Sequence, residues 1–317
     1  MRALEVADWR PQAMAHKERI LGLVHGSIDV DPKHPIFNFL FQYYSFPPGL
    51  LLKWSPGIYA SCNGVSTARE PLLWTGKGWE WDPALAGSGH MAPKQCVASR
   101  RRAARSAAEI MRVCQTRAPH LNCFGLHEWA MLYQPSAAQA APRRHQQLPL
   151  RLSQSELNAV VEEQQIGCTH FDAFRFFTPE ATPLNTVRDV TRDRQPANEQ
   201  PGCVHSSMDL FRYSLQLWPW IPAELLADTL ELAIAARVLD MRASPYDLSE
   251  YHCADGQGQG FDLSPVPIER ASGRRTYQLI QADLARRAAP LRTRLLREYE
   301  AVIAVWDQEE AQAGPEP

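Results

Sequence analysis

Histidines and carboxylates within otherwise apolar segments are the residues of this chain best suited to chemistry. The first such segment is LHEWAM, which contains His127 and Glu128. Neighbouring side chains of a helix point about 100° apart, so only one of the two needs to face a site. A histidine bonded to the backbone of the core is the structural alternative.

The second segment, HFDAFRFF, places His170, Asp172 and Arg175 among four phenylalanines. Burial of a charge is unfavourable unless the charge is paired. If the segment is helical, Asp172 and Arg175 are close enough for an ion pair, and His170 shares a face with Phe174. A functional site and a salt bridge over an aromatic core both fit this pattern.

The third segment, CVHSSMDLFRY, has His205 and Asp209 four residues apart. Residues with this spacing lie on one face of a helix. The spacing is typical of two metal ligands, or of a histidine oriented by a carboxylate, and it also arises by chance.

The fourth segment, RVLDMRASPYDL, places Asp240 near the predicted C-terminal end of a helix, together with Arg242, Tyr246 and Asp247. The helix dipole is unfavourable for an acid at that end. We therefore expect Asp240 to be held by a partner, such as an arginine that fixes the turn, or to be retained for a task.

The elements that position these side chains are predicted to be mainly α-helical. The 317 residues, 45% of them apolar, are interpreted as one helical domain over 1–317 with irregular excursions rich in Trp, Gly and Pro. Apolar periodicity, the capping pair Ser153 and Glu156, and proline stops delimit the helices. The expected helical segments are 12–29, 34–46, 99–116, 121–133, one that starts at Ser153, 203–218, 222–242 and 274–309, the last broken by Pro290.

Four stretches lack helical periodicity. Residues 49–89 are predicted to form loops and short strands. An exposed loop is expected over 134–150, a loop rich in Gly and Pro over 252–275, and a disordered tail over 310–317.

Composition narrows the possible functions. The net charge of -2 provides no overall positive field for nucleic acid, although the run from Arg100 to Arg105 could contact phosphate or form a solvated face. Seven cysteines without a CxxC pair are typical of a reducing compartment, and no signal peptide or membrane span is evident, so a cytoplasmic location is expected. The nucleotide-binding motifs GxGxxG and GxxxxGK[ST] are absent, as are HExxH and GxSxG.

Five segments together resemble a bacterial family whose members carry the name 3-methyladenine DNA glycosylase. They are KHPIFNFLFQYYSF, CFGLHEWAMLY, THFDAFRFFTPEATPLNT, EQPGCVHSSMDL and RVLDMRASPYDL. The resemblance implies a base-removing N-glycosylase acting on alkylated purines in DNA. Such an enzyme needs an aromatic pocket for a flipped base and a catalytic carboxylate. The implied carboxylates are Asp240, Asp209 and Glu128, and the implied substrate-binding residues are Trp129, Tyr133, Phe174, Phe177, Arg242 and Tyr246.

Two other functions remain open. In the first, His127, His170 and His205 converge with Glu128 or Asp209 on one iron or zinc ion in an enzyme that acts on a small molecule. In the second, the aromatic residues bind a small ligand without turnover. Each function that uses the four segments requires His127, His170, His205 and Asp240 to lie close together.

Overall fold

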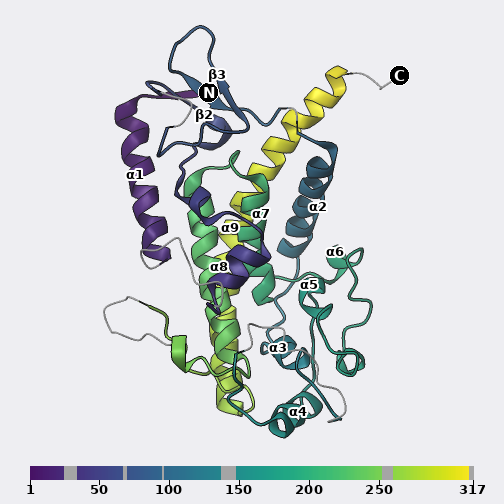
Figure 1. Cartoon of the computed structure of the whole chain (residues 1–317). Coiled ribbons are helices and arrows are strands. Elements are labelled where there is room, and N and C mark those ends of the chain that lie inside the picture. The colour runs from purple at the N-terminus through teal and green to yellow at the C-terminus, as the bar shows by residue number, and fades with distance from the viewer. Residues whose placement is uncertain (25–33, 67–69, 95, 137–147, 252–259, 314–317) are drawn as a thin grey trace.

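The computed structural model describes residues 1–24, 34–66, 70–94, 96–136, 148–251 and 260–313. Helices dominate these ranges, and one small sheet accompanies them, which confirms the predicted mainly α fold (Figure 1). None of the helices within these ranges combines the length and the apolar character needed to cross a membrane.

Three helices form the centre of the molecule: α7 (Val204–Leu217), α8 (Ala223–Ala243) and α9 (Ala271–Ala313). Helix α8 is buried along almost its whole length, as expected for a helix that is apolar on every side. Helix α2 (Ala98–Gln115) packs on α7 and α9, and α1 (Val6–Leu23) packs on α8 (Figure 1).

Three predictions for the region of helix α9 are wrong. The helix continues through Pro290, which is exposed, so the backbone group that loses its hydrogen bond can be solvated. It begins at Ala271 and ends at Ala313, so 271–275 are not loop and 310–313 are not a disordered tail. At its C-terminal end Arg101 of α2 binds Glu309, with Nη2 and Oε2 2.7 Å apart, and this contact holds the last turns in place. Residues 252–259 and 314–317 lie outside the described ranges.

The small sheet includes the first residues of the chain as its strand β1, Arg2–Leu4 (Figure 1). Its order is β1, β2 (Ala60–Cys62), β4 (Gly89–Met91) and β3 (Trp79–Trp81). Strand β1 runs parallel to β2, and the other pairs are antiparallel. With the 3-10 turns η2 (Pro48–Leu52) and η3 (Gly57–Tyr59), these strands confirm the irregular structure predicted for 49–89.

Short elements surround the opposite end of the central helices (Figure 1). They are η1 (Asn38–Tyr43), α3 (Leu126–Ala130), α4 (Gln154–Glu163), α5 (Phe171–Phe174), η4 (Thr182–Leu184), α6 (Gln195–Asn198) and η5 (Ser249–Tyr251). The Ser153–Glu156 capping box of α4 forms as predicted. The predicted helix over 121–133 is wrong outside Leu126–Ala130. On its N-terminal side the left-handed backbone angles of Phe124 and Gly125 prevent a continuous helix. In 34–46 only a six-residue π-helix forms.

The predicted exposed loop over 134–150 falls mostly on 137–147, which lie outside the described ranges. Only part of its end is exposed, because Leu148 is buried and Leu150 pairs with Tyr246 in an isolated bridge, whereas Pro149 is exposed. Arg151 then binds Glu269 through two hydrogen bonds, of 2.7 and 2.9 Å. The end of this stretch is therefore anchored to the core.

Candidate metal centre

Three histidines and one aspartate from separate segments meet where α7 begins and α8 ends. His127 lies on α3, His170 directly precedes α5, His205 lies in the first turn of α7, and Asp240 lies in the last turn of α8. The His205 ring lies between the other two, with ring centroids 4.5 Å from His127 and 5.0 Å from His170. All four side chains are buried. The convergence expected from the four segments is therefore present.

A glycine and a short helix bring His127 to the end of α8. Gly125 has a φ of 70°, and a Cβ at this position would lie 3.3 Å from the Cβ of Ala243. Trp129 also anchors α3, because its Nε1 donates to the Ala243 carbonyl at 2.9 Å. The tight turn and this bond place the His127 ring against Asp240, one helical turn before Ala243.

His127 and Asp240 form a close, buried ion pair: burial lowers the pKa of His127, but the Asp240 carboxylate raises it more, so the net shift is upward. Nε2 of His127 lies 3.0 Å from Oδ1 of Asp240. Their orientation does not meet hydrogen-bond geometry, and both atoms are buried with no hydrogen-bond partner among the described residues. If an ion displaced the proton of His127, the two facing atoms would be arranged like two ligands of that ion.

Arg237 holds the carboxylate of Asp240 in place. Its Nη1 donates to Asp240 Oδ2 at 2.5 Å and to Glu128 Oε1 at 2.9 Å, and its Nε donates to the Pro35 carbonyl at 3.2 Å. Burial disfavours the charged form of Asp240, but His127 and Arg237 outweigh this effect and lower its pKa. Asp240 is therefore a carboxylate at neutral pH, with Oδ2 bonded and Oδ1 facing His127.

His205 is the neutral member of the histidine row. Burial, together with the nearby His127 and His170 rings, lowers its pKa well below the ordinary value. Among the described residues, none forms a hydrogen bond with its ring nitrogens. Since a histidine binds a metal through a neutral imidazole nitrogen, His205 is already in the state that a metal requires. One ligand atom from each of His127, His205 and Asp240 lies within 4.8 Å of the other two.

His170 belongs to a second set of side chains. Its Nδ1 is 3.1 Å from Glu199 Oε2 and its Nε2 is 3.8 Å from Asp209 Oδ2. Burial lowers the pKa of His170, but Glu199 and then Asp209 raise it more, so the net shift is upward. Asp209 itself is bound by Arg212, whose Nε donates to Oδ1 at 2.9 Å.

The structure changes the expected ligand set. The three histidines do not converge on one point with Glu128 or Asp209, because Arg237 binds Glu128 and Arg212 binds Asp209. Within the described ranges, the groups with metal-ligand proximity are His127 with His205 and Asp240, and His170 with Glu199 and Cys203. Sequence reasoning did not single out Arg237, Glu199 or Cys203. For Cys203 the available signal was its position beside His205, although the two residues belong to different sets.

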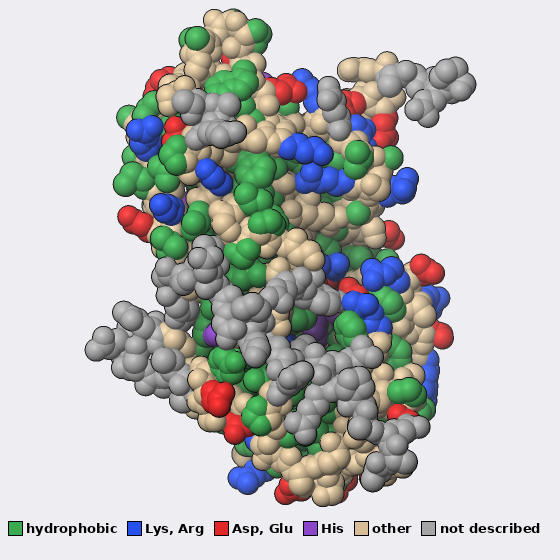
Figure 2. All heavy atoms as spheres, viewed as in Figure 1, with side chains coloured by type: hydrophobic (Ala, Val, Ile, Leu, Met, Phe, Trp, Pro, Cys, Tyr) green, Lys and Arg blue, Asp and Glu red, His purple; other side chains and the backbone are tan. Residues whose placement is uncertain are grey.

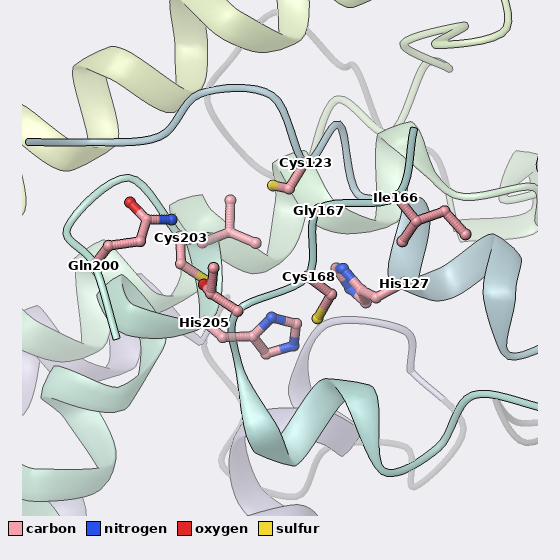
Figure 3. A pocket seen from close by; sticks show the side chains of 10 residues that line it. Cys123, His127, Ile166, Gly167, Cys168, Gln200, Cys203 and His205 are labelled. Atoms are coloured by element: carbon pink, nitrogen blue, oxygen red, sulfur yellow. The ribbon is translucent and has the colours of Figure 1, made fainter. Parts of the chain in front are cut away.

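A small cavity opens beside the histidines. Cys123, Cys168 and Cys203 line it together with His127 and His205, and Cys168 projects between the two histidine rings (Figure 3). The room inside is about that of one water molecule. On the face seen in Figure 2, histidine atoms appear in a recess at mid-height. Three of the seven cysteines, distant in sequence, thus meet at one site.

The six side chains that the resemblance implies for a base-binding pocket are buried or make contacts with other residues of the protein. Trp129 is fully buried, and the Tyr133 hydroxyl donates to Glu162 Oε1 at 2.8 Å. Phe174 and Phe177 pack on each other with ring centroids 5.0 Å apart. Tyr246 is buried, and Arg242 Nε donates to the Ser264 carbonyl at 2.8 Å. None of these six side chains lines the cavity beside the histidines within the described residues.

The donor set of the first group is two imidazole nitrogens and one carboxylate oxygen. Sets of this kind bind iron and zinc and leave coordination positions open for water or substrate. Comparison with protein families, with curated proteins and with solved structures gave no match for this chain. The geometry of the described residues is therefore the basis of the functional proposal.

Proposed function

We propose that this protein is a metal-dependent enzyme that acts on a small molecule, with His127, His205 and Asp240 as the ligands of one divalent iron or zinc ion. The observation that carries the proposal is the convergence of buried His127, His205 and Asp240, each with a ligand atom within 4.8 Å of the other two, and the 3.0 Å approach of His127 Nε2 to Asp240 Oδ1. With metal bonds of about 2.1 Å, two adjacent ligands stand about 3.0 Å apart in an octahedral site and about 3.4 Å apart in a tetrahedral one. The pair therefore already has the spacing of two ligands.

Arg237 supports this role. Residues that bind the second atom of a ligand fix its orientation and tune the metal. Because Arg237 occupies Oδ2, Asp240 presents a single oxygen toward His127. This arrangement favours monodentate coordination by Asp240.

The cavity next to His127 and His205 could hold a water or substrate atom at the remaining coordination positions of the metal ion. A divalent ion there would lower the pKa of a bound water or polarise a bound substrate. The cavity between the described residues has room for about one water molecule, so we propose a small molecule as the substrate.

Metal analysis of the purified full-length protein tests the proposal. We expect His205→Ala to lose one equivalent of iron or zinc relative to the wild type, because His205 contributes a ligand and makes no other hydrogen bond among the described residues. His90→Ala, which changes a partly exposed histidine of β4 in the small sheet, should lose none. A wild-type protein with well below one ion per chain after reconstitution would refute the proposal, as would an unchanged metal content in His205→Ala.

The resemblance to the glycosylase family stays a separate prediction for the same carboxylates. It requires release of free 3-methyladenine from alkylated DNA, and loss of that release in Asp240→Asn. Because Asp240 is buried between Arg237 and His127, a base would have to displace packed side chains to reach it. The assay should include metal-free and metal-loaded protein, so that the two functions are separated in one experiment.

A further inference from the structure

The second set of side chains, formed by His170, Glu199 and Cys203, has the composition of a thiolate metal site. One ligand atom from each lies within 4.8 Å of the other two, and all three side chains are buried. Zinc sites in proteins combine imidazole nitrogen, carboxylate oxygen and cysteine sulfur. A sulfur donor also favours zinc over harder ions such as magnesium.

Glu199 supplies an independent observation. Its Oε2 accepts hydrogen bonds from His170 Nδ1 at 3.1 Å and from Gln195 Nε2 at 3.4 Å. Its Oε1 is buried and has no hydrogen-bond partner among the described residues. A His170–Glu199 ion pair alone would account for Oε2 and would leave Oε1 unsatisfied.

The turn that carries Glu199 and Cys203 is held rigidly. Gln281 Nε2 donates to the Gly202 carbonyl at 2.7 Å, and the Gly202 amide donates to Gln200 Oε1 at 2.7 Å. A Cβ at Gly202 would lie 2.5 Å from the His120 carbonyl oxygen, so only glycine allows this close approach. Rigid support of this kind is what preorganises a ligand set.

Cys203 lies at the positive end of a helix. It is the N-cap residue of α7, where the helix dipole favours a negative charge. Burial raises the pKa of the Cys203 thiol well above its usual value, and Glu199 adds to the shift. The thiol is therefore protonated in the ion-free protein, and metal binding would replace its proton, which leaves to solvent.

We propose that His170, Glu199 and Cys203 bind a second divalent cation of the zinc class, next to the site formed by His127, His205 and Asp240. The two sets adjoin each other through the stacked rings of His170 and His205, which are 5.0 Å apart and inclined by 12°. The second set shares no ligand with the first. This inference therefore does not depend on the proposed function.

Reconstitution of the full-length protein with Co²⁺ tests the second site, because a cysteine thiolate bound to Co²⁺ produces a near-ultraviolet charge-transfer band. We expect the wild type to show this band and to bind two ions per chain. Cys203→Ser should abolish the band and lose one ion, with Cys203→Ala as a second variant should the serine protein fail to fold. Cys168→Ser should keep the band, because Cys168 lines the same cavity but is outside the ligand set.

The two proposals fail separately in this experiment. His205→Ala should keep the thiolate band while it loses the ion of the first site. A protein that binds one ion, sensitive to Cys203→Ser but not to His205→Ala, would support the second site and refute the first. Absence of the band in the wild type at saturating Co²⁺ would refute the second site, as would a band that survives in both Cys203 variants.

Discussion

The arginines of α2 and the histidines beside α3 both face carboxylates, but the two regions satisfy those carboxylates differently. Arg101 donates to Glu309 at 2.7 Å and to Glu310 at 3.0 Å, and Arg105 donates to Asp307 at 2.5 Å. These contacts all have hydrogen-bond geometry and lie near the surface. His127 and Asp240 are equally close, yet they are buried and not aligned for a hydrogen bond.

In the α2 region the protein itself supplies hydrogen-bond partners for most of the charged side chains. A phosphate contact is one of the two roles predicted for the arginine run from Arg100 to Arg105, but α9 supplies acids to Arg101 and Arg105. Arg100 instead donates to the Gln216 and Trp218 carbonyls and lies 4.1 Å over the Trp220 ring. In the buried cluster the contact between His127 Nε2 and Asp240 Oδ1 is short but poorly aligned. The proposed metal ion would replace the proton of His127 and bond both atoms.

The largest effect is expected from Arg237→Met. This change removes the guanidinium that Glu128 and Asp240 share, and loss of one partner of a buried ion pair costs about 3 to 5 kcal/mol. Urea unfolding followed by circular dichroism measures the change in the free energy of unfolding. A loss below about 1 kcal/mol would show that the carboxylates are satisfied without Arg237.

An intermediate effect is expected from metal binding. In a Cys203→Ala background, where only the first site remains, zinc at about 100 times its dissociation constant should raise the free energy of unfolding by about 2.7 kcal/mol. Adding His205→Ala should remove this gain, because a ligand is lost. His16→Ala is the matched control, since His16 is buried but bonds the Leu51 carbonyl at 2.8 Å, away from the cluster. Retention of the full gain in His205→Ala would contradict the proposed ligand set.

The smallest effect is expected from Arg105→Met, the same substitution in the other region. Arg105 and its partners Asp307 and Glu310 are largely exposed, and exposed ion pairs contribute about 0 to 1 kcal/mol. The loss should shrink further at high salt because mobile ions screen surface charges. Unfolding curves at low and high ionic strength measure this. A loss comparable to that of Arg237→Met would remove the distinction between the two regions.

Local patterns in the sequence were sufficient for much of the fold. The proline at position 222 and the turn at Ser244 bracket α8, and the Ser153–Glu156 pair marks the start of α4, as predicted. Signals of this kind act within one helical turn, so they can be read without knowledge of distant contacts. Pro290 misled the prediction for α9, because packing against other helices keeps the helix continuous there.

The sequence by itself indicated His127, His170, His205 and Asp240 as candidate site residues, because polar groups in apolar segments need hydrogen-bond or ionic partners. Only the tertiary structure decided which partners they have. Spacing on one helix suggested His205 with Asp209, but the fold pairs His205 with Asp240 of α8 and His170 with Glu199. The physical reason is that a helical pattern specifies which face a side chain occupies, whereas contacts across the bundle depend on how separate helices pack.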